Sequence, residues 1–297
     1  MDVGLIGLGR MGGNMATRLV RGGHRIVGFD PSSAARQAAQ TGGIETAASL
    51  RELVTALPIP RVVWIMVPAG EPTEIALRDL AELLAPGDTI VEGGNTHYKD
   101  DVRRAPALVA RGLRYVDAGV SGGIWGLTEG YCLMVGGERD VVQRLAPIFT
   151  TLAPPDGWLH AGPVGSGHYV KMIHNGIEYG LMQAYAEGFE LMSESDYGLD
   201  LAAIARLWNR GSVVRSWLLE LAAGALSHDP KLAAIKGWVE DSGEGRWTIA
   251  DAVEKAVAAP VITASLYARF RSRRENSFAD RLLAALRNAF GGHAVRR

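Results

Sequence analysis

The sequence predicts an α/β domain with a doubly wound sheet followed by an all-α domain, and three observations support this fold class. Short apolar runs alternate with segments of helical periodicity through the first half of the 297 residues, which is typical of strands joined by helices. Residues 166–195 then form one long helical pattern without a strand-like break. Prolines and glycines cluster over residues 151–162. We therefore expect one domain over residues 1–162 and a helical domain over residues 163–297.

Each strand expected in the first domain is a short apolar run, and each helix repeats apolar residues every three or four positions. The expected strands cover Val3–Leu8, Arg25–Phe29, Val62–Val67, Asp88–Glu92, Arg114–Ala118 and Tyr131–Val135. The expected helices cover Met11–Arg21, Pro31–Gln40, Thr73–Leu84 and Asp100–Arg111. Beyond the long helix, further helical stretches lie at Leu201–Asn209, Val214–Ala223 and Phe278–Phe290. The alternation in the first half predicts a parallel sheet covered by helices on both faces.

Composition excludes several classes of protein. Lysine and arginine number 31 against 32 for aspartate and glutamate, and this balance is not that of a basic nucleic-acid binder. The single cysteine, Cys132, excludes an internal disulfide and a multi-cysteine metal site. The most apolar run, Val62–Val67, is far shorter than the ~20 residues of a membrane helix, and no basic leader precedes the first strand. We expect a cytoplasmic protein without membrane or nucleic-acid partners.

A glycine-rich motif joins the first expected strand to the first helix. It reads Gly7-Leu8-Gly9-Arg10-Met11-Gly12, and its glycines would allow a tight turn, backbone approach to a pyrophosphate and close helix packing. The second strand ends at Asp30, whose carboxylate can accept hydrogen bonds from ribose hydroxyls and would repel a 2′-phosphate. We therefore predict a Rossmann-type domain that prefers NAD, with NADP possible because Arg36 could accommodate the phosphate. The alternative is a tight strand–helix turn without a ligand.

Three further turns follow expected strands and would line the same crevice, because open parallel sheets bind ligands outside the carboxyl ends of their strands. They are Val67-Pro68-Ala69, Glu92-Gly93-Gly94-Asn95 and Ser121-Gly122-Gly123. The Asn95 amide can donate and accept hydrogen bonds, and the Ser121 hydroxyl can bond a carboxylate or a hydroxyl. Simple turn chemistry is the alternative for each turn. The sequence shows no carboxylate cluster of the kind that a catalytic Mg²⁺ needs, so we expect no metal.

The long helix carries a polar stripe. Its members, at i, i+3, i+4 and i+7, are Lys171, His174, Asn175 and Glu178. A separate apolar face carries Val170, Ile173, Ile177 and Leu181. If the stripe faces the crevice, partial desolvation lowers the pKa of the lysine and lets it act as a general base. The alternatives are a solvated helix surface and, for the histidine alone, a structural role.

The C-terminal motif reads Arg287-Asn-Ala-Phe-Gly-Gly-His293. An arginine and a histidine around the end of a helix suit an anionic group such as a phosphate. A basic helix terminus that complements the helix dipole is the alternative.

Over nearly its whole length the sequence resembles the decarboxylating 6-phosphogluconate dehydrogenases, in the short form of that family. The most specific stretches are Gly119-Val-Ser121-Gly122-Gly123, Lys171-Met-Ile-His174-Asn175-Gly-Ile-Glu178-Tyr179 and the tail motif that ends at His293. The wider β-hydroxyacid dehydrogenase superfamily shares the N-terminal glycine motif and the helix lysine and asparagine. It does not share the full helix string or the tail.

The resemblance implies a role for each matching residue. Lys171 would be the general base for the hydroxyl on the third carbon of the substrate, and Glu178 would protonate the carbon that carbon dioxide has left, which becomes the first carbon of the product. The implied sugar-acid contacts are Asn95, Ser121, Gly122, Gly123, His174 and Asn175, and the implied phosphate contacts are Tyr179, Arg269, Arg287 and His293. In long members the tail arginine and histidine come from the partner subunit, so the resemblance implies a homodimer or homotetramer with shared sites.

One loop departs from the family pattern. Where long members carry a lysine and a threonine for the phosphate, this chain has Ser242 and Glu244. A glutamate beside a phosphate is unfavourable, so either Arg246 and Arg271 compensate for it or the phosphate is held differently.

The leading hypothesis is NAD-preferring oxidative decarboxylation of 6-phospho-D-gluconate, a reaction of the pentose phosphate pathway. One alternative is a dehydrogenase of a small unphosphorylated β-hydroxyacid such as 3-hydroxyisobutyrate, which would give Arg287 and His293 no phosphate to bind. The other is a catalytically silent NAD-binding protein, and the presence of both Lys171 and Glu178 argues against it.

Overall fold

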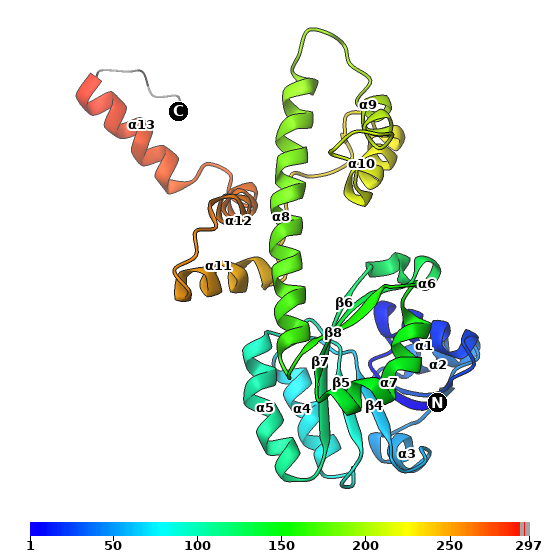
Figure 1. The fold of residues 1–297 in the computed structure, drawn as a ribbon. Coiled ribbons are helices and arrows are strands. Elements are labelled where there is room, and N and C mark those ends of the chain that lie inside the picture. The colour runs from blue at the N-terminus through cyan, green and yellow to red at the C-terminus, as the bar shows by residue number, and fades with distance from the viewer. Residues whose placement is uncertain (292–293, 295–297) are drawn as a thin grey trace. The chain divides into compact units, whose positions relative to one another are not determined.

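The computed structural model describes residues 1–291 and residue 294, so His293 of the tail motif lies outside the described part of the chain. The chain forms two compact units, Met1–His174 and Asn175–Arg297. Helix α8 (Ser166–Ser193) begins in the first unit and continues into the second, as Figure 1 shows. Within the described residues, no helix has both the length and the apolar character that crossing a bilayer requires.

The first unit contains an eight-stranded sheet in the order β3-β2-β1-β4-β5-β6-β7-β8. The strands are β1 (Asp2–Ile6), β2 (Arg25–Phe29), β3 (Glu45–Thr46), β4 (Val62–Ile65), β5 (Thr89–Glu92), β6 (Arg114–Ser121), β7 (Cys132–Gly137) and β8 (Trp158–Gly162). The chain order reverses direction beside β1, which lies between β2 and β4. The crevice outside the carboxyl ends of β1 and β4 is therefore the position where doubly wound sheets bind ligands.

The sheet is parallel from β3 through β6, but β7 pairs with β6 in the antiparallel direction. The connection over residues 122–131 explains this departure from the expected parallel sheet. It is shorter than the dozen or more residues that a parallel crossover needs. The chain consequently turns back directly, and the end of β6 faces the start of β7, with Ser121 opposite Cys132.

Both faces of the sheet are buried. Successive residues of a strand point to opposite faces, so one strand contributes to the hydrophobic cluster on each face. Val3 and Leu5 of β1 belong to one hydrophobic cluster, and Ile6 belongs to the other. Helices α1 (Arg10–Arg21) and α7 (Arg139–Leu152) contribute to the first cluster, and α3 (Leu50–Thr55), α4 (Glu71–Ala81) and α5 (Tyr98–Ala110) contribute to the second. The remaining short helices are α2 (Ser33–Thr41), the 3₁₀ turn η1 (Gly123–Trp125) and α6 (Gly126–Glu129).

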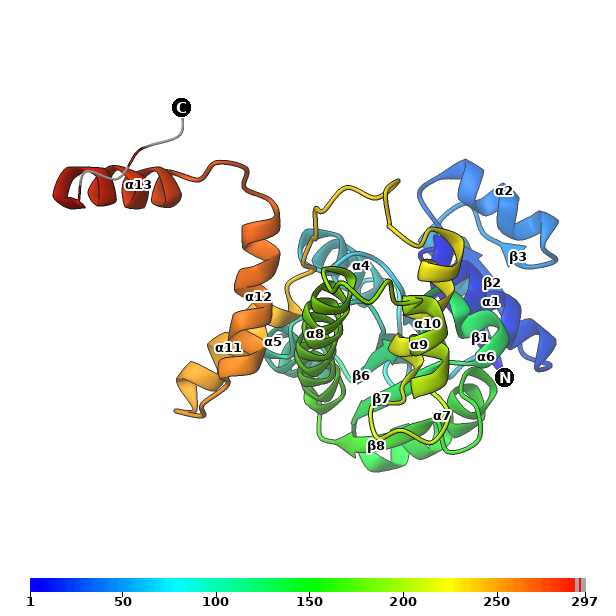
Figure 2. The same ribbon diagram turned by 90° about the horizontal axis from the view of Figure 1, so that it is seen from above.

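The second unit is helical. After α8 come α9 (Leu201–Trp208), α10 (Trp217–His228), α11 (Glu244–Glu254), α12 (Pro260–Ser272) and α13 (Phe278–Gly291). Helices α9 and α10 lie side by side in Figures 1 and 2, and Ala205, Leu219 and Ala223 form the small core between them. Tyr185 and Phe189 of α8 pack against this core.

Several elements were not expected from the sequence. They are β3, α3, α6, α7, β8, α11 and α12. Helix α7 contains Pro147, and Gly245 lies in the first turn of α11. Strand β8 lies at the sheet edge with mostly half-buried residues, so its sequence lacks the apolar run that marks the central strands.

Candidate active site

The glycine motif after β1 has the geometry of a dinucleotide-binding turn. Gly7 has φ +93°, and a Cβ there would lie 2.3 Å from the Met66 carbonyl oxygen. A Cβ on Gly12 would lie 1.9 Å from the Gly7 carbonyl oxygen, so α1 packs directly on the turn. Gly9 has no atom within 4 Å of its Cβ position, which leaves the space in front of the helix N-terminus open. This open side suits a pyrophosphate, which the backbone amides and helix dipole stabilise.

The remaining residues of the motif lie in the same turn. Leu8 is buried, and Arg10 and Met11 form the first turn of α1. The Leu8 amide donates a 2.8 Å hydrogen bond to Asp30 Oδ2 at the end of β2, and the Ser32 amide donates a 2.8 Å bond to Asp30 Oδ1. The backbone thus fixes the Asp30 carboxylate beside the glycine turn. Each carboxylate oxygen keeps a lone pair that can accept a ribose hydroxyl.

Arg36 contacts the backbone of the loop that follows β2. Its Nη1 donates to the Asp30 carbonyl oxygen at 2.6 Å and to the Pro31 carbonyl oxygen at 3.2 Å. The guanidinium therefore lies on the loop behind the Asp30 carboxylate. This arrangement favours a diol over a phosphate at this position, because the negative charge of Asp30 is not paired with Arg36.

The turns after β4 and β5 pack tightly against each other. A Cβ on Gly94 would lie 2.6 Å from the Val67 carbonyl oxygen, and the Gly94 amide donates to Glu92 Oε1 at 2.8 Å. Thr73 Oγ1 donates to the Pro68 carbonyl oxygen at 2.9 Å, which holds Val67-Pro68-Ala69 against the start of α4. Asn95 follows Gly94 and is half-buried. The structure thus brings together the two turns that the sequence assigns to one crevice.

Lys171 lies against the carboxyl end of β6 because Gly119 has no side chain. A Cβ on Gly119 would lie 2.5 Å from Lys171 Cβ and 2.8 Å from the Gly167 carbonyl oxygen. Burial raises the pKa of the Cys132 thiol and the charge of Lys171 acts in the opposite direction, so the ammonium lies close to the start of β7. Ser121 pairs with Cys132, and Gly122 and Gly123 follow with φ +126° and +53°. Lys171 and the Ser121 turn are therefore neighbours.

A buried group of ionisable residues lies beneath these segments, and it was not expected from the sequence. Glu92 ends β5, Asp101 lies on α5, Asp117 lies in β6 and His168 lies in the first turn of α8. Within the described residues, Glu92, Asp101 and His168 form a group whose ligand atoms lie within 4.8 Å of one another. His168 Nδ1, however, already donates a 2.7 Å hydrogen bond to Asp101 Oδ2. A metal ligand must give up this proton, so the arrangement fits an ion cluster better than a metal site.

The part of the polar stripe in the second unit contacts the loop before α11. Asn175 is buried, and its Nδ2 donates to Glu244 Oε1 at 2.6 Å, while Ser242 Oγ donates to Glu244 Oε2 at 2.7 Å. Lys171, His174 and Glu178 are half-buried. The stripe is therefore not a solvated surface. Its apolar neighbours Val170, Ile177 and Leu181 are the more exposed face of α8.

Tyr179 and Arg269, two of the expected phosphate contacts, lie together in the second unit. The Arg269 guanidinium lies 3.6 Å from the centroid of the Tyr179 ring, and the Tyr179 hydroxyl accepts a 3.3 Å bond from the Ser242 amide. Arg287 lies exposed on α13, and no contact among the described residues joins it to this pair. Two of the four expected contacts are thus neighbours within one chain.

The arginines expected to compensate for Glu244 have other partners. Arg246 donates two hydrogen bonds to Asp241, at 2.7 Å and 3.1 Å, and Arg271 pairs with Asp280. Glu244 is balanced instead by Asn175 and Ser242. Of the two possibilities left open by the sequence, compensation by Arg246 and Arg271 has no support in these contacts.

Comparison with known proteins covers both units. Residues 2–162 match the family described as the NAD binding domain of 6-phosphogluconate dehydrogenase, and residues 167–281 match the 6-phosphogluconate dehydrogenase C-terminal domain.

Relatives of two lengths are similar to the chain. The NAD(+)-dependent, decarboxylating 6-phosphogluconate dehydrogenase of Haloferax volcanii is 46% identical over 299 residues, which cover 100% of this chain and 99% of the relative. The enzyme of the same description from Bacillus subtilis (strain 168) is 35% identical over 95% of this chain. The chain spans 64% of the length of that second, longer relative.

Solved structures give the same picture. The Plasmodium falciparum 6-phosphogluconate dehydrogenase, solved alone, with NADP+ and with 6-phosphogluconate, has a TM-score of 0.85 at 27% identity and covers 100% of this chain and 66% of its own. A 3-hydroxyisobutyrate dehydrogenase of Mycobacterium tuberculosis has a TM-score of 0.74 at 22% identity, covering 96% of this chain and 99% of its own, and shares the fold.

Proposed function

The chain belongs to the 6-phosphogluconate dehydrogenase family, and we propose that it catalyses the NAD-dependent oxidative decarboxylation of 6-phospho-D-gluconate to ribulose 5-phosphate and carbon dioxide. The observation that carries the proposal is the place of Lys171. Gly119 allows α8 to pack on β6, so that the Lys171 side chain starts beside the Ser121-Gly122-Gly123 turn. A base and a group of hydrogen-bonding partners for a hydroxy acid therefore occur together.

The residues of the glycine turn fit NAD. Neighbouring backbone occupies the space at the Cβ positions of Gly7 and Gly12, whereas the space at the Cβ position of Gly9 is open. The Leu8 amide fixes the Asp30 carboxylate. The pyrophosphate would lie on the Gly7–Gly12 turn and the adenosine ribose on Asp30, with Val67-Pro68-Ala69 and Asn95 nearer the nicotinamide. When bound, NAD supplies the acceptor for the hydride on the third carbon of the substrate.

Lys171 performs the proton transfers at the third carbon. As a neutral amine it takes the hydroxyl proton while the hydride leaves, which makes a carbonyl β to the carboxylate. The bond between the first and second carbons then breaks, carbon dioxide leaves, and the electron pair moves onto the new carbonyl. The Lys171 ammonium returns its proton to that oxygen and stabilises the developing charge.

Glu178 completes the reaction in this proposal. It donates a proton to the carbon that lost carbon dioxide, and the enediol becomes the ketose product. His174 and Asn175, together with Asn95, Ser121, Gly122 and Gly123, hold the carboxylate and hydroxyls. The hydrogen bond from the Asn175 amide to Glu244 fixes the orientation of the asparagine side chain.

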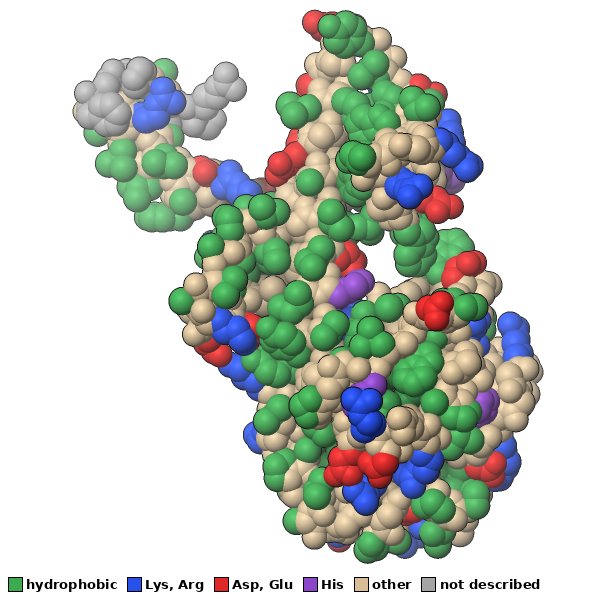
Figure 3. Space-filling model, in the orientation of Figure 1, with side chains coloured by type: hydrophobic (Ala, Val, Ile, Leu, Met, Phe, Trp, Pro, Cys, Tyr) green, Lys and Arg blue, Asp and Glu red, His purple; other side chains and the backbone are tan. Residues whose placement is uncertain are grey.

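The distal phosphate is held by Tyr179 and Arg269 in this proposal. Arg287 and His293 join them from the second subunit of a dimer, as in the longer family members. The exposed apolar face of α8 supports dimerisation, since Ile177 and Leu181 are 52% and 46% exposed in the single chain. Figure 3 shows further hydrophobic side chains on the surface of the helical unit. Light scattering coupled to size exclusion gives the number of subunits.

The test is steady-state reduction of NAD and of NADP by 6-phosphogluconate, with carbon dioxide release measured in parallel. We expect stoichiometric NADH and carbon dioxide and a higher kcat/KM with NAD. Unphosphorylated gluconate and 3-hydroxyisobutyrate serve as controls for the phosphate requirement. Turnover of 3-hydroxyisobutyrate in preference to 6-phosphogluconate contradicts the proposal and supports the small-acid alternative.

A further inference from the structure

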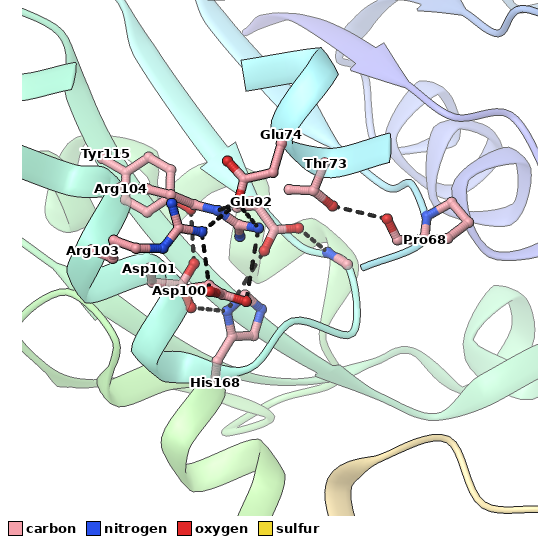
Figure 4. A network of polar contacts seen from close by, with 11 residues as sticks. Pro68, Thr73, Glu74, Glu92, Asp100, Asp101, Arg103, Arg104, Tyr115 and His168 are labelled. Atoms are coloured by element: carbon pink, nitrogen blue, oxygen red, sulfur yellow. Dashed lines mark hydrogen bonds and ion pairs between the residues drawn. The ribbon is translucent and has the colours of Figure 1, made fainter. Parts of the chain in front are cut away.

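Four ionisable side chains form what we call the buried ion cluster: Glu92, Asp101, Asp117 and His168. The three acidic residues are 0% exposed and His168 is 2% exposed. Figure 4 shows His168 pointing from the start of α8 toward Asp101 and Glu92, with Tyr115 and Arg104 beside them. The mechanism proposed above uses none of these four residues. Charged groups this deeply buried are costly unless they are paired, so their presence needs an explanation.

The hydrogen bonds of the cluster join separate elements. His168 Nδ1 donates to Asp101 Oδ2 at 2.7 Å and lies 3.8 Å from Glu92 Oε2. The Tyr115 hydroxyl donates to Asp101 Oδ1 at 2.7 Å. Asp117 accepts from two amides at the start of α8, from Gly165 at 2.7 Å and from His168 at 2.9 Å. Strands β5 and β6 and helices α5 and α8 are therefore tied at one point.

Each of three segments that carry proposed substrate contacts begins at a member of this cluster. Glu92 accepts the Gly94 amide, and Asn95 is the next residue. Asp117 precedes Gly119 and Ser121 in the same strand. His168 lies one helical turn before Lys171. All of these residues belong to the first unit, Met1–His174.

The positive charge of His168 offsets the negative charges of the buried carboxylates around it. Burial alone lowers the pKa of His168, but the carboxylates of Asp101, Glu92 and Asp117 raise it to about 10. His168 is therefore an imidazolium at neutral pH. Burial raises the pKa of Glu92 and of Asp117 above their usual values, and the His168 charge opposes this in both. Without the imidazolium, buried carboxylates would face one another uncompensated.

We propose that His168 is a positioning residue for Lys171, and that the buried ion cluster holds the Asn95, Ser121 and Lys171 segments in register for the reaction. The catalytic part of this inference rests on the proposed function. Loss of the cluster leaves the Lys171 amine and the glycine turn chemically intact. It allows the start of α8 to move against β5 and β6, and displacement of a catalytic group by about 1 Å can cost ~10²-fold in rate.

The variants that test the proposal are His168→Asn and Asp101→Asn. The asparagine in His168→Asn can still donate to Asp101 but carries no charge, and Asp101→Asn keeps its size while removing one carboxylate. We expect each to lower kcat for 6-phosphogluconate by ~10- to 100-fold, while the Kd for NAD measured by calorimetry changes by less than about threefold. If His168→Asn does not fold, Asp101→Asn decides.

Asp88→Asn is the matched control. Asp88 is also 0% exposed and accepts hydrogen bonds from the amides of Arg61 and Ala85 and from the Arg61 guanidinium, but it lies just before the other end of β5. We expect it to lower the Tm with kcat per folded enzyme unchanged. Equal losses of kcat in Asp88→Asn and Asp101→Asn would mean that the cluster stabilises the fold and nothing more, and would overturn the proposal.

Hydrogen exchange gives a readout that does not depend on turnover. In His168→Asn and in Asp101→Asn, we expect faster exchange in peptides covering residues 90–97 and 163–171 together, and no such pair of changes in Asp88→Asn. Faster exchange confined to residues 163–171 would show that the cluster does not join the two segments, and would overturn the proposal. If the unaltered enzyme does not oxidise 6-phosphogluconate, the proposed function fails, and the exchange result alone decides whether the cluster joins these segments.

Discussion

Replacing Gly119 by alanine should disable the enzyme through one methyl group. The added Cβ would lie 2.5 Å from Lys171 Cβ and 2.8 Å from the Gly167 carbonyl oxygen, both on α8. Neither neighbour can swing away, because one is the first side-chain atom of Lys171 and the other is helix backbone. The strand cannot yield easily either, since β6 is paired on both sides by β5 and β7. The start of α8 must therefore move.

The size of the movement follows from the distances. Ordinary contact begins at 3.4 Å, so the Lys171 Cβ must retreat from 2.5 Å by about 0.9 Å. Overpacking of this kind costs ~1–3 kcal/mol of stability. A shift of about 1 Å in a catalytic group lowers the rate by ~10²-fold. We therefore expect a folded protein with a reduced Tm, an unchanged Kd for NAD and a kcat reduced by ~10²-fold.

Gly188→Ala is the control for this experiment. Gly188 lies on the same helix and has nothing within 4 Å of its Cβ position, so alanine there should be neutral or stabilise the helix by up to ~1 kcal/mol. Thermal unfolding, calorimetry with NAD and steady-state kinetics are measured on both variants. A Gly119→Ala enzyme with the original kcat would show that α8 need not pack this closely on β6 for Lys171 to work, and the reasoning would be refuted.

Three further predictions concern single side chains. Lys171→Met should abolish turnover with NAD binding intact, and retained activity would remove Lys171 from the role of base. Asp30→Ser should weaken NAD binding and shift the kcat/KM ratio toward NADP, because it removes the carboxylate that the Leu8 and Ser32 amides hold in place; an unchanged ratio would assign the preference elsewhere. Hydrogen bonds from Arg246 and then Arg273 lower the pKa of Asp241 to about 2. The stabilisation is therefore complete above the unfolded pKa near 3.8 and is lost as the pH falls through 2, so Asp241→Asn should lower the unfolding free energy by at most ~2 kcal/mol at pH 6 and by much less near pH 2.

Much of the first unit could be predicted because its central strands carry strong local signals. The strand Arg25–Phe29 has the bounds expected from its apolar run, and the glycine motif is followed by α1 as its spacing requires. Strand β8 and helix α7 were missed. Strand β8 lies half-exposed at the sheet edge and lacks an apolar run. Helix α7 does carry buried apolar residues at helical spacing, including Val141, Leu145 and Ile148, so its pattern was present in the sequence.

The candidate site divides in the same way. Gly7, Asp30 and Lys171 could be found because each belongs to a short motif with a fixed spacing. The buried ion cluster could not, since His168 lies 67 residues after Asp101 and no single motif joins the cluster residues. The side chains of Glu92, Asp101 and His168 meet only because the fold brings α5 and the start of α8 to the end of β5. His168 lies one helical turn before Lys171, but that spacing alone does not mark it as a member of a buried cluster.

Glu244 shows how a residue that looks unfavourable in the sequence can fit the structure. Next to an expected phosphate site it suggests repulsion, yet its carboxylate is 4% exposed and accepts hydrogen bonds from Asn175 and Ser242. It also begins α11, where a negative charge is stabilised by the helix dipole. The carboxylate therefore orients the Asn175 amide, and the proposed phosphate contacts Tyr179 and Arg269 lie together without it. The hydrogen bonds from Asn175 and Ser242 therefore explain how Glu244 is accommodated at this position, which removes the conflict that the sequence alone presents.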